Sequence, residues 1–241
     1  MIQLSRFFFN GNYVEGSKIS LDSDTAKHIW QVLRMRVGER ILLSNGNGCL
    51  AIGLLDTIER TICIVSMEKI INIERNSSLL TIGIALTKNN NRNEWMLEKI
   101  TELGVNKIIP IETSRTEKIH FRAERWGKII LSAMLQSQQN YVPELSSVVK
   151  LKEVLKKHDH IPQKLIAHCI DDADKISLSK LLKPAMNTII LIGPEGDFSP
   201  EEVILCKENN YKSFSLGKQR LRTETAAITA CAYYNVVNDE K

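Results

Sequence analysis

The sequence predicts an α/β protein in which a small β-rich domain precedes a parallel sheet covered by helices. Short strand-like runs and one helical stretch fill the first seventy residues, after which strands and helices alternate. The later strands are uninterrupted apolar runs such as Asn187–Gly193 (NTIILIG), which is typical of parallel strands buried on both faces. The expected boundaries are residues 1–72 for the first domain, 73–78 for a polar linker and 79–241 for the second domain.

The first domain is expected to be a small barrel with one helix. The predicted strands are Ser5–Phe9, Lys18–Leu21, Arg40–Ser44, Cys49–Asp56 and Thr61–Lys69. The stretch Asn45–Gly48 (NGNG) predicts a hairpin, because Asn and Gly tolerate the positive φ angles that such turns need. Ser23–Met35 carries apolar residues at helical spacing and predicts the helix.

The second domain is expected to alternate strands and helices. The predicted strands are Leu79–Ala85, Lys107–Glu112, Lys164–Cys169, Asn187–Gly193 and Ser213–Gly217. The predicted helices are Asn91–Leu103, Phe121–Asn140, Leu151–Lys157, Ile176–Leu182, Pro200–Asn209 and Thr223–Val237. Ligands of open parallel sheets bind beyond the carboxyl ends of the strands, so the informative loops are those that follow each strand.

Composition narrows the class of protein without identifying it. The net charge is +4, and residues 1–72 are not strongly basic, so a nucleic-acid surface would have to be local. The five cysteines are scattered and include no CxxC pair, which favours reduced thiols and argues against a zinc site. We expect no metal site, and with no signal-peptide pattern at the N-terminus we expect a cytoplasmic protein.

Two glycine-containing loops stand out near the C-terminus. Leu191–Glu202 (LIGPEGDFSPEE) places GPEG after an apolar strand, and its SPEE tail predicts a helix cap by Ser199 with Glu202 completing a capping box. Leu216–Ala227 (LGKQRLRTETAA) again joins a glycine-ended strand to a helix start. Each loop alone fits a tight turn. Side by side they would present backbone N–H and C=O groups to a flat polar ligand such as an adenine nucleoside.

This pair of loops resembles the signature of the 16S ribosomal RNA uridine-N3 methyltransferases, the RsmE family of the SPOUT class. Other segments agree along almost the whole chain. They are Ser5–Phe8 (SRFF), His28–Arg36 (HIWQVLRMR) with Gly38, Lys99–Val105, Ile108–Ser114, and Trp126 with Ala133, Gln136, Ser137 and Pro143. Several motifs in the right order are far more specific than any one of them.

The resemblance implies a PUA-like N-terminal barrel and a SPOUT domain with a deep C-terminal trefoil knot. It further implies a homodimer that uses S-adenosylmethionine to methylate N3 of a uridine in 16S ribosomal RNA of the small subunit. The third wall of the cofactor pocket would be the turn near Ala167–Cys169. The residues expected to bind the cofactor are Ala167, His168, Ile192, Gly193, Pro194, Glu195, Gly196, Leu216, Gly217, Leu221, Arg222, Thr225 and Ala226.

The reaction indicates which residue types it needs. Uridine N3 must lose its proton, and negative charge then spreads over O2 and O4. Arg222 is the candidate for stabilising that charge, since guanidinium donors suit a delocalised anion. Glu224 or Glu195 would accept the proton or hold the arginine. The chain departs from the family at Asp197, where a glycine is usual. Its carboxylate would reach a ribose hydroxyl, reach the ammonium of methionine or face water, and we favour water.

The candidate RNA contacts are basic residues of the first domain and of loops beyond the strand ends. They are Arg6, Arg34, Arg36, Lys88, Arg92, Arg115 and Lys118. The polar run Thr87–Glu94 is expected to form a substrate loop, and Trp30, Trp95 and Trp126 are expected to belong to the core. Two alternatives stay open at this point: a non-catalytic RNA-binding or ribosome-assembly factor, and a nucleotide-dependent oxidoreductase with a degenerate Rossmann fold.

Overall fold

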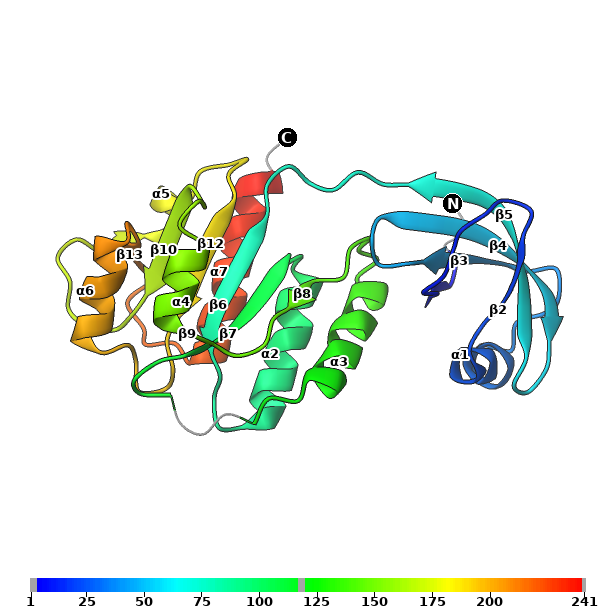
Figure 1. Cartoon of the computed structure of the whole chain (residues 1–241), viewed down its shortest axis with the longest axis horizontal. Coiled ribbons are helices and arrows are strands. Elements are labelled where there is room, and N and C mark those ends of the chain that lie inside the picture. The colour runs from blue at the N-terminus through cyan, green and yellow to red at the C-terminus, as the bar shows by residue number, and fades with distance from the viewer. Residues whose placement is uncertain (1–3, 117–119, 240–241) are drawn as a thin grey trace. The chain divides into compact units, whose positions relative to one another are not determined.

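A computed structural model describes residues 4–116 and 120–239, and these divide into two compact units (Figure 1). Unit 1 contains the described residues up to Arg75 together with Met134–Val142, and unit 2 contains the other described residues. The division after Arg75 falls within the polar stretch 73–78, whereas the expected boundaries assign residues 134–142 to the second domain. Among the described residues no helix combines the length and apolarity that crossing a membrane requires.

Unit 1 is built on a five-stranded sheet in the order β1-β3-β4-β5-β2. Its strands are β1 (Arg6–Phe8), β2 (Lys18–Ser20), β3 (Arg40–Ser44), β4 (Cys49–Ile58) and β5 (Cys63–Asn72). The first pair is parallel and the others are antiparallel. Gly46 and Gly48 have positive φ, which confirms the hairpin predicted between β3 and β4. The core of this unit contains alternate strand residues such as Ile41, Leu43 and Val65.

The single helix predicted for unit 1 is two short pieces. An α-helix, α1 (Ser23–Lys27), begins at Asp22, whose carboxylate accepts from the N–H groups of Asp24 and Thr25. The chain then widens into a π-helix, η1 (His28–Val32), in which the N–H of Leu33 donates to the carbonyl of His28. Helical spacing of apolar residues cannot distinguish these two hydrogen-bond patterns, because both keep Ile29 facing the core.

Residues 134–142 pack within unit 1 through specific bonds. The guanidinium of Arg6 donates to Asn140 Oδ1 at 2.8 Å, and the Tyr141 hydroxyl donates to the carbonyl of Ile73 at 2.7 Å. The predicted helix Phe121–Asn140 is therefore shorter in the structure, where α3 spans Ala123–Gln136. It ends there because Gln138 adopts a left-handed conformation with φ 59°.

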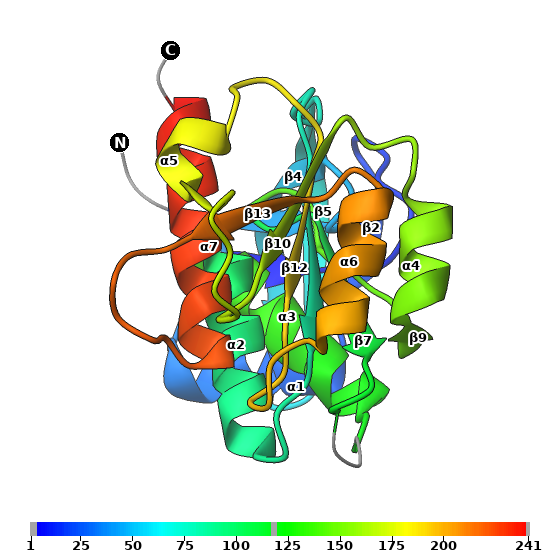
Figure 2. The same ribbon diagram turned by 90° about the vertical axis from the view of Figure 1, so that its left-hand side faces the viewer.

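Unit 2 contains an eight-stranded parallel sheet in the order β11-β13-β10-β12-β6-β7-β8, and β9 also pairs with β7. Figure 2 labels β13, β10, β12 and β7 of this sheet. Its strands are β6 (Leu80–Ala85), β7 (Lys107–Glu112), β8 (Glu144–Leu145), β9 (Val149–Lys150), β10 (Gln163–Ala167), β11 (Ile176–Ser177), β12 (Thr188–Ile192) and β13 (Lys212–Ser215). Every residue of β6 and β12 is buried, as their apolar sequences predict. The two-residue strands β8, β9 and β11 escaped prediction because such short segments have no period.

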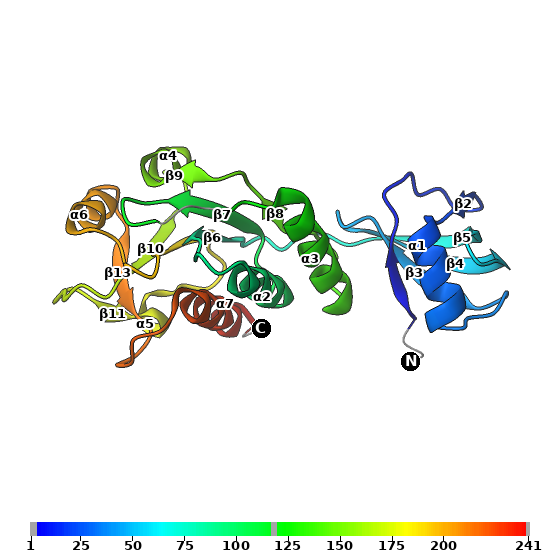
Figure 3. The same ribbon diagram turned by 90° about the horizontal axis from the view of Figure 1, so that it is seen from below.

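Helices cover both faces of this sheet. They are α2 (Asn90–Glu102), α3, α4 (Leu151–Lys157), α5 (Leu178–Leu181), α6 (Pro200–Glu208) and α7 (Thr223–Asp239). One face packs against α4 and α6 through Leu151, Val154, Val203 and Cys206. Figure 3 shows α2, α5 and α7 on the opposite face. The predicted parallel sheet covered by helices is confirmed, and the trefoil knot stays a prediction.

The three tryptophans do not all belong to the core. Trp126 is fully buried, as expected, but Trp30 is 43% exposed and Trp95 is 47% exposed. The expectation was wrong for these two because a neighbouring residue takes the inward position. Ile29 is buried beside Trp30, and Met96 and Leu97 are buried beside Trp95.

Candidate functional site

A cavity of about 780 Å³ lies in unit 2 at the carboxyl ends of β10, β12 and β13. It is lined by the three loops that follow these strands and by one residue of α2. The lining residues are Arg92, Ala167, His168, Cys169, Asp171, Lys175, Ile192, Gly193, Pro194, Glu195, Asp197, Phe214, Ser215, Leu216, Gly217, Lys218, Gln219, Arg220, Leu221, Arg222, Thr223 and Ala226. The volume is that of a site for a drug-sized or nucleoside-sized ligand.

The loop between β12 and α6 is fixed by contacts at almost every residue. Gly193 has little room for a side chain, because a Cβ there would lie 3.0 Å from the ring of Phe198, which is fully buried. The N–H of Asp197 donates to the carbonyl of Pro194 at 2.9 Å and closes the turn. The predicted capping box of Ser199 and Glu202 is present at the start of α6. This loop is therefore a preformed wall of the cavity.

Asp197 joins this wall to a second one. Its φ is 66°, so an aspartate occupies a left-handed position that usually favours glycine. The carboxylate accepts from the backbone N–H of Cys169 at 2.8 Å. The expectation that this carboxylate faces water was wrong, because a chain N–H at the end of β10 lies within reach of it. Asp197 thus ties the β12–α6 loop to the β10–β11 loop.

The loop between β13 and α7 forms another wall, and among the described residues its hydrogen bonds lie at its two ends. At one end Gly217 has φ 130°, and its N–H donates to Ser215 Oγ at 3.2 Å. At the other end the hydroxyl of Thr223, which is buried, donates to the carbonyl of Gly193 at 3.0 Å. Between these points residues 217–220 are exposed, and Figure 2 shows the connection bowing away from the sheet.

Arg92 brings two carboxylates together at the edge of the cavity. Its guanidinium lies 3.4 Å from Glu195 Oε1 and 3.7 Å from Glu224 Oε1. Glu195 lines the cavity, whereas Glu224 is buried in the first turn of α7. Glu224 Oε2 has no hydrogen-bond partner among the described residues. The helix N-terminus favours a negative charge at this position.

A cluster of polar side chains holds the β10–β11 loop in place. The buried ring of His168 places Nε2 2.9 Å from Ser213 Oγ and 3.4 Å from Asp172 Oδ2. Lys207 pairs with the same carboxylate at 2.8 Å, and this contact holds the pKa of Asp172 well below its usual range. Burial lowers the pKa of His168, so its imidazole is neutral at pH 7. The side chain of His168 therefore helps to fix the loop.

The structure brings together most of the residues predicted to bind the cofactor. The exceptions are Gly196 and Thr225, which do not line the cavity. Arg222 lines the cavity and is exposed, and its side chain makes no hydrogen bond or ion pair with the described residues. Cavity residues outside the set predicted to bind the cofactor include Arg92, Lys175 and Thr223. Thr223 could have been found as the first residue of a helix that faces the loop.

The residues predicted to contact RNA fall into different environments. Arg34 and Arg36 are exposed, and their side chains have no partner among the described residues. Arg115 donates to the carbonyl of Gly196 at 2.9 Å. Arg6 is bonded inside unit 1 to Asn140, and burial lowers its pKa, so it serves the packing of that unit.

Two further parts of the RNA prediction need comment. Lys88 is exposed, and Lys118 lies outside the described residues. Part of Thr87–Glu94, the expected substrate loop, is helical, because Asn89 caps α2 and residues from Asn90 onward belong to that helix. Arg92 therefore reaches the cavity from the first turn of a helix.

This arrangement suits a ligand that needs shape and backbone contacts more than a reactive side chain. Apolar groups such as Ile192, Leu221 and Ala226 line the interior, and cations and carboxylates stand around them. The described residues contain no cluster of three or more His, Cys, Asp or Glu side chains that could hold a metal ion. The site therefore offers binding, orientation and charge stabilisation.

Comparison with known proteins identifies the class. The RNA methyltransferase domain family matches residues 74–235, and the RNA methyltransferase PUA domain family matches residues 21–65. The ribosomal RNA small subunit methyltransferase E of Rickettsia conorii is 31% identical over 96% of this chain and 95% of its own length.

Solved structures agree over nearly the full length. A Legionella pneumophila methyltransferase in complex with its cofactor SAM is 28% identical, with a TM-score of 0.86, and the match covers 98% of this chain and 99% of that one. A ribosomal RNA small subunit methyltransferase E from Neisseria gonorrhoeae, bound to S-adenosyl methionine, is 27% identical with a TM-score of 0.84. That match covers 99% of this chain and 100% of that one.

These matches define the protein as an RNA methyltransferase with a PUA domain. The chain belongs to the ribosomal RNA small subunit methyltransferase E family. The resemblance seen in the sequence is thereby confirmed. It is favoured over the two alternative functions, the non-catalytic factor and the oxidoreductase.

Proposed function

We propose that this protein transfers a methyl group from S-adenosylmethionine to 16S ribosomal RNA of the small subunit, at N3 of a uridine. The observation that carries the proposal is the cavity of about 780 Å³ at the ends of β10, β12 and β13. Family membership supports the reaction class, and two SAM-bound solved structures support the cofactor.

The residues of the cavity fit S-adenosylmethionine. Its backbone-lined walls and apolar interior suit an adenine ring, which needs edge hydrogen bonds and two flat contacts. The carboxylates of Asp171 and Glu195 suit the positive groups of the molecule, and Lys175 suits its carboxylate. When bound, S-adenosylmethionine supplies an electrophilic methyl group on a sulfonium centre, so the chemistry requires no metal.

The protein must then align the uracil ring and manage one proton and one charge. The new bond joins N3 to the methyl carbon, the bond from that carbon to sulfur breaks, and the N3 proton passes to a carboxylate. Arg222 lines the cavity, and its guanidinium has no partner in the part of the chain that the structure describes, so it can stabilise the charge shared by O2 and O4 as the proton leaves. Holding the reactants in line supplies a further large part of the rate.

The sequence left two roles open, accepting the proton and holding an arginine, and Glu195 and Glu224 are the candidates for them. Glu195 lines the cavity, so its carboxylate can reach the imide proton. Glu224 is buried behind it and holds Arg92, whose guanidinium also contacts Glu195. We therefore assign proton acceptance to Glu195 and positioning of Arg92 to Glu224.

The test uses in vitro transcribed small-subunit RNA, isolated subunits and methyl-labelled S-adenosylmethionine, followed by mapping of the modified base. We expect label at N3 of one uridine. Arg222→Ala should keep S-adenosylmethionine binding and lose about 100- to 1,000-fold in kcat. Arg220→Ala, a neighbouring exposed arginine, should lose much less. Wild-type turnover by Arg222→Ala would overturn the assignment, and label on a different base would overturn the proposed substrate.

We further propose that the protein is a cytoplasmic homodimer with a knotted C-terminal region. Support for self-association comes from apolar side chains left exposed on two packed helices, Trp95 on α2 and Val236 on α7. Light scattering coupled to gel filtration tests this state. A measured molecular mass equal to that of a single chain, at micromolar protein concentration, would overturn the proposed homodimer.

A further inference from the structure

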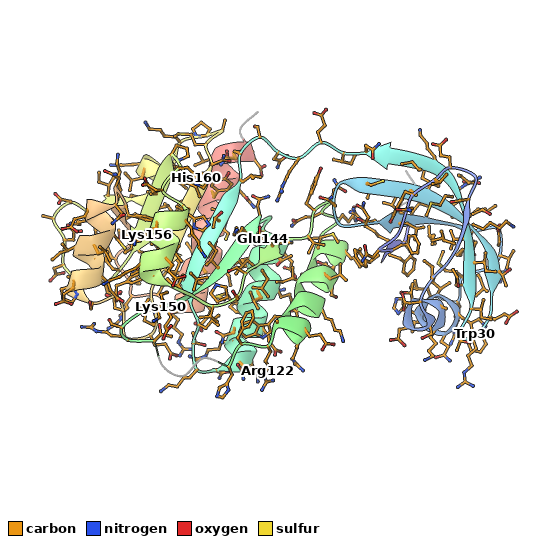
Figure 4. The ribbon with its side chains drawn as sticks, viewed as in Figure 1. Trp30, Arg122, Glu144, Lys150, Lys156 and His160 are labelled. Carbon is orange, nitrogen blue, oxygen red and sulfur yellow. The ribbon has the colours of Figure 1, made fainter. Side chains whose placement is uncertain are left out.

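A short stretch of unit 1 exposes apolar side chains where a helix would normally bury them. Five consecutive residues, 30–34, are exposed, and Trp30, Val32 and Leu33 are 43%, 65% and 40% exposed. Val37 nearby is 61% exposed. Trp30, labelled in Figure 4, lies at the surface of unit 1. Clustered exposed apolar groups mark a surface that binds something, whereas single ones need no explanation.

The backbone of this stretch is held in uncommon conformations. Trp30 lies in the π-helix η1, a form that is rare and frequently found at functional sites. Two residues after η1, Arg34 has φ 51°, in the left-handed region that long side chains rarely adopt. The N–H of Met35 donates to the carbonyl of Ile29 and closes this widened turn. The chain therefore accepts unfavourable local geometry while presenting Trp30 and Arg34 to solvent.

The charge of the stretch identifies the kind of partner. Residues 27–38 include Lys27, Arg34 and Arg36 and no carboxylate. The side chains of Arg34 and Arg36 make no ion pair or hydrogen bond with any described residue, although carboxylates elsewhere on unit 1 pair with cations, as Glu68 does with Arg40. An aromatic ring beside unpaired guanidinium groups is the combination that binds unpaired nucleotides, by stacking on the base and contacting the phosphates.

We propose that Trp30 stacks on an unpaired base of the RNA substrate while Arg34 and Arg36 contact the flanking phosphates. The proposal rests on the proposed function for the class of partner, and it adds the site and the manner of binding. A second copy of this chain is a poorer occupant. A symmetric contact through this surface would bring the unpaired cations of both copies together, and like charges at an interface are unfavourable.

The experiment compares RNA affinities of the full chain and its variants. Trp30→Ala should raise the Kd for small-subunit ribosomal RNA by about 5- to 150-fold, the range that loss of one base–aromatic stack produces. Trp30→Phe keeps a ring and should recover most of the affinity. Ile204→Ala, an exposed apolar residue of α6, is the control and should bind RNA as the wild type does.

Two further measurements separate stacking from simple attraction of charge. Stacking needs an unpaired base, so Trp30→Ala should lose affinity for the folded ribosomal RNA but not for a fully paired RNA duplex of the same length. The double variant Arg34→Ala/Arg36→Ala should weaken binding to both RNAs and should lower the slope of log Kd against log salt concentration by about 2, one for each phosphate contact.

Several results would overturn the proposal. One is wild-type RNA affinity in a Trp30→Ala variant whose melting temperature is unchanged. Another is a loss of affinity for the fully paired duplex as large as the loss of affinity for the folded ribosomal RNA. A change in oligomeric state without any change in RNA affinity would assign the surface to self-association. Titration of S-adenosylmethionine keeps the two proposals distinct, because Trp30→Ala should bind it normally. If Trp30→Ala weakens RNA binding as expected but the wild-type protein transfers no methyl group, only the proposed function is refuted.

Discussion

The two cavity loops that follow β12 and β13 have similar positions in the fold and opposite constraints. Each has a glycine within two residues of the end of its strand, and each leads into a helix. The β12–α6 loop is bonded at Gly193, Asp197 and Ser199 to other parts of unit 2 or to its own helix. In the β13–α7 loop residues 217–220 are exposed.

The contrast teaches how one cavity can combine fixed and adaptable parts. A wall whose polar groups are satisfied holds its geometry without the ligand, so its binding contacts cost little further ordering. An exposed wall carrying Lys218, Arg220 and Arg222 can move as the ligand enters, and its cations can meet a negatively charged RNA. We therefore expect substitutions in the first loop to affect cofactor affinity and stability more than those in the middle of the second.

The largest effect is expected at Thr223, where the two loops meet. Thr223→Val keeps the shape of the side chain but leaves the buried carbonyl of Gly193 without its donor. An unsatisfied buried carbonyl costs about 1–3 kcal/mol. We expect the free energy of unfolding, measured by urea denaturation, to fall by about that amount, and the Kd for S-adenosylmethionine to rise about 10-fold or more.

Thr229→Val is the matched control in the same helix. Its hydroxyl donates to the carbonyl of Thr225 four residues earlier and touches neither loop. This change should leave the Kd for S-adenosylmethionine unaltered. Equal losses of cofactor affinity in both variants would show that α7, and not the contact between the loops, determines the site.

A smaller effect is expected at Asp197. Asp197→Gly tolerates the left-handed backbone but removes the acceptor for the N–H of Cys169. We expect the Kd for S-adenosylmethionine, measured by calorimetry, to rise about 3- to 10-fold, as for the loss of one partly exposed hydrogen bond. Asp197→Asn retains an acceptor oxygen and should lose less. If the glycine variant binds as tightly as the wild type, the tie between the two walls has no role in binding.

Much of the fold could be predicted because hydrophobic pattern and capping residues are local signals. The fully buried strands β6 and β12 read as unbroken apolar runs, and the capping box at Ser199 was visible as four letters. The π-helix η1 and the exposure of Trp30 were not predictable in this way, since they depend on which neighbouring residue the core of unit 1 buries. The return of residues 134–142 to unit 1 depends on pairing with distant residues such as Arg6.

The site was predictable where loops supply it and unpredictable where side chains meet across the fold. Gly193 and Gly217 stood out because each lies between a predicted strand and a predicted helix start. The convergence of Arg92 with Glu195 and Glu224 was not predictable, because Arg92 lies about a hundred positions or more along the chain from either glutamate. Arg92 was expected to contact RNA, and only the packing of α2 against α7 shows it bridging two carboxylates.

The smallest effect is expected in the middle of the β13–α7 loop. It tests most directly whether this loop is less constrained than the β12–α6 loop. Lys218 is exposed and makes no ion pair with the described residues, so Lys218→Ala should change the free energy of unfolding by less than about 0.5 kcal/mol. The Kd for S-adenosylmethionine should change by less than about 3-fold. RNA affinity should fall slightly and only at low salt, because one exposed cation contributes a screened attraction. A loss of stability as large as that of Thr223→Val would mean that this wall is fixed in the same way as the first.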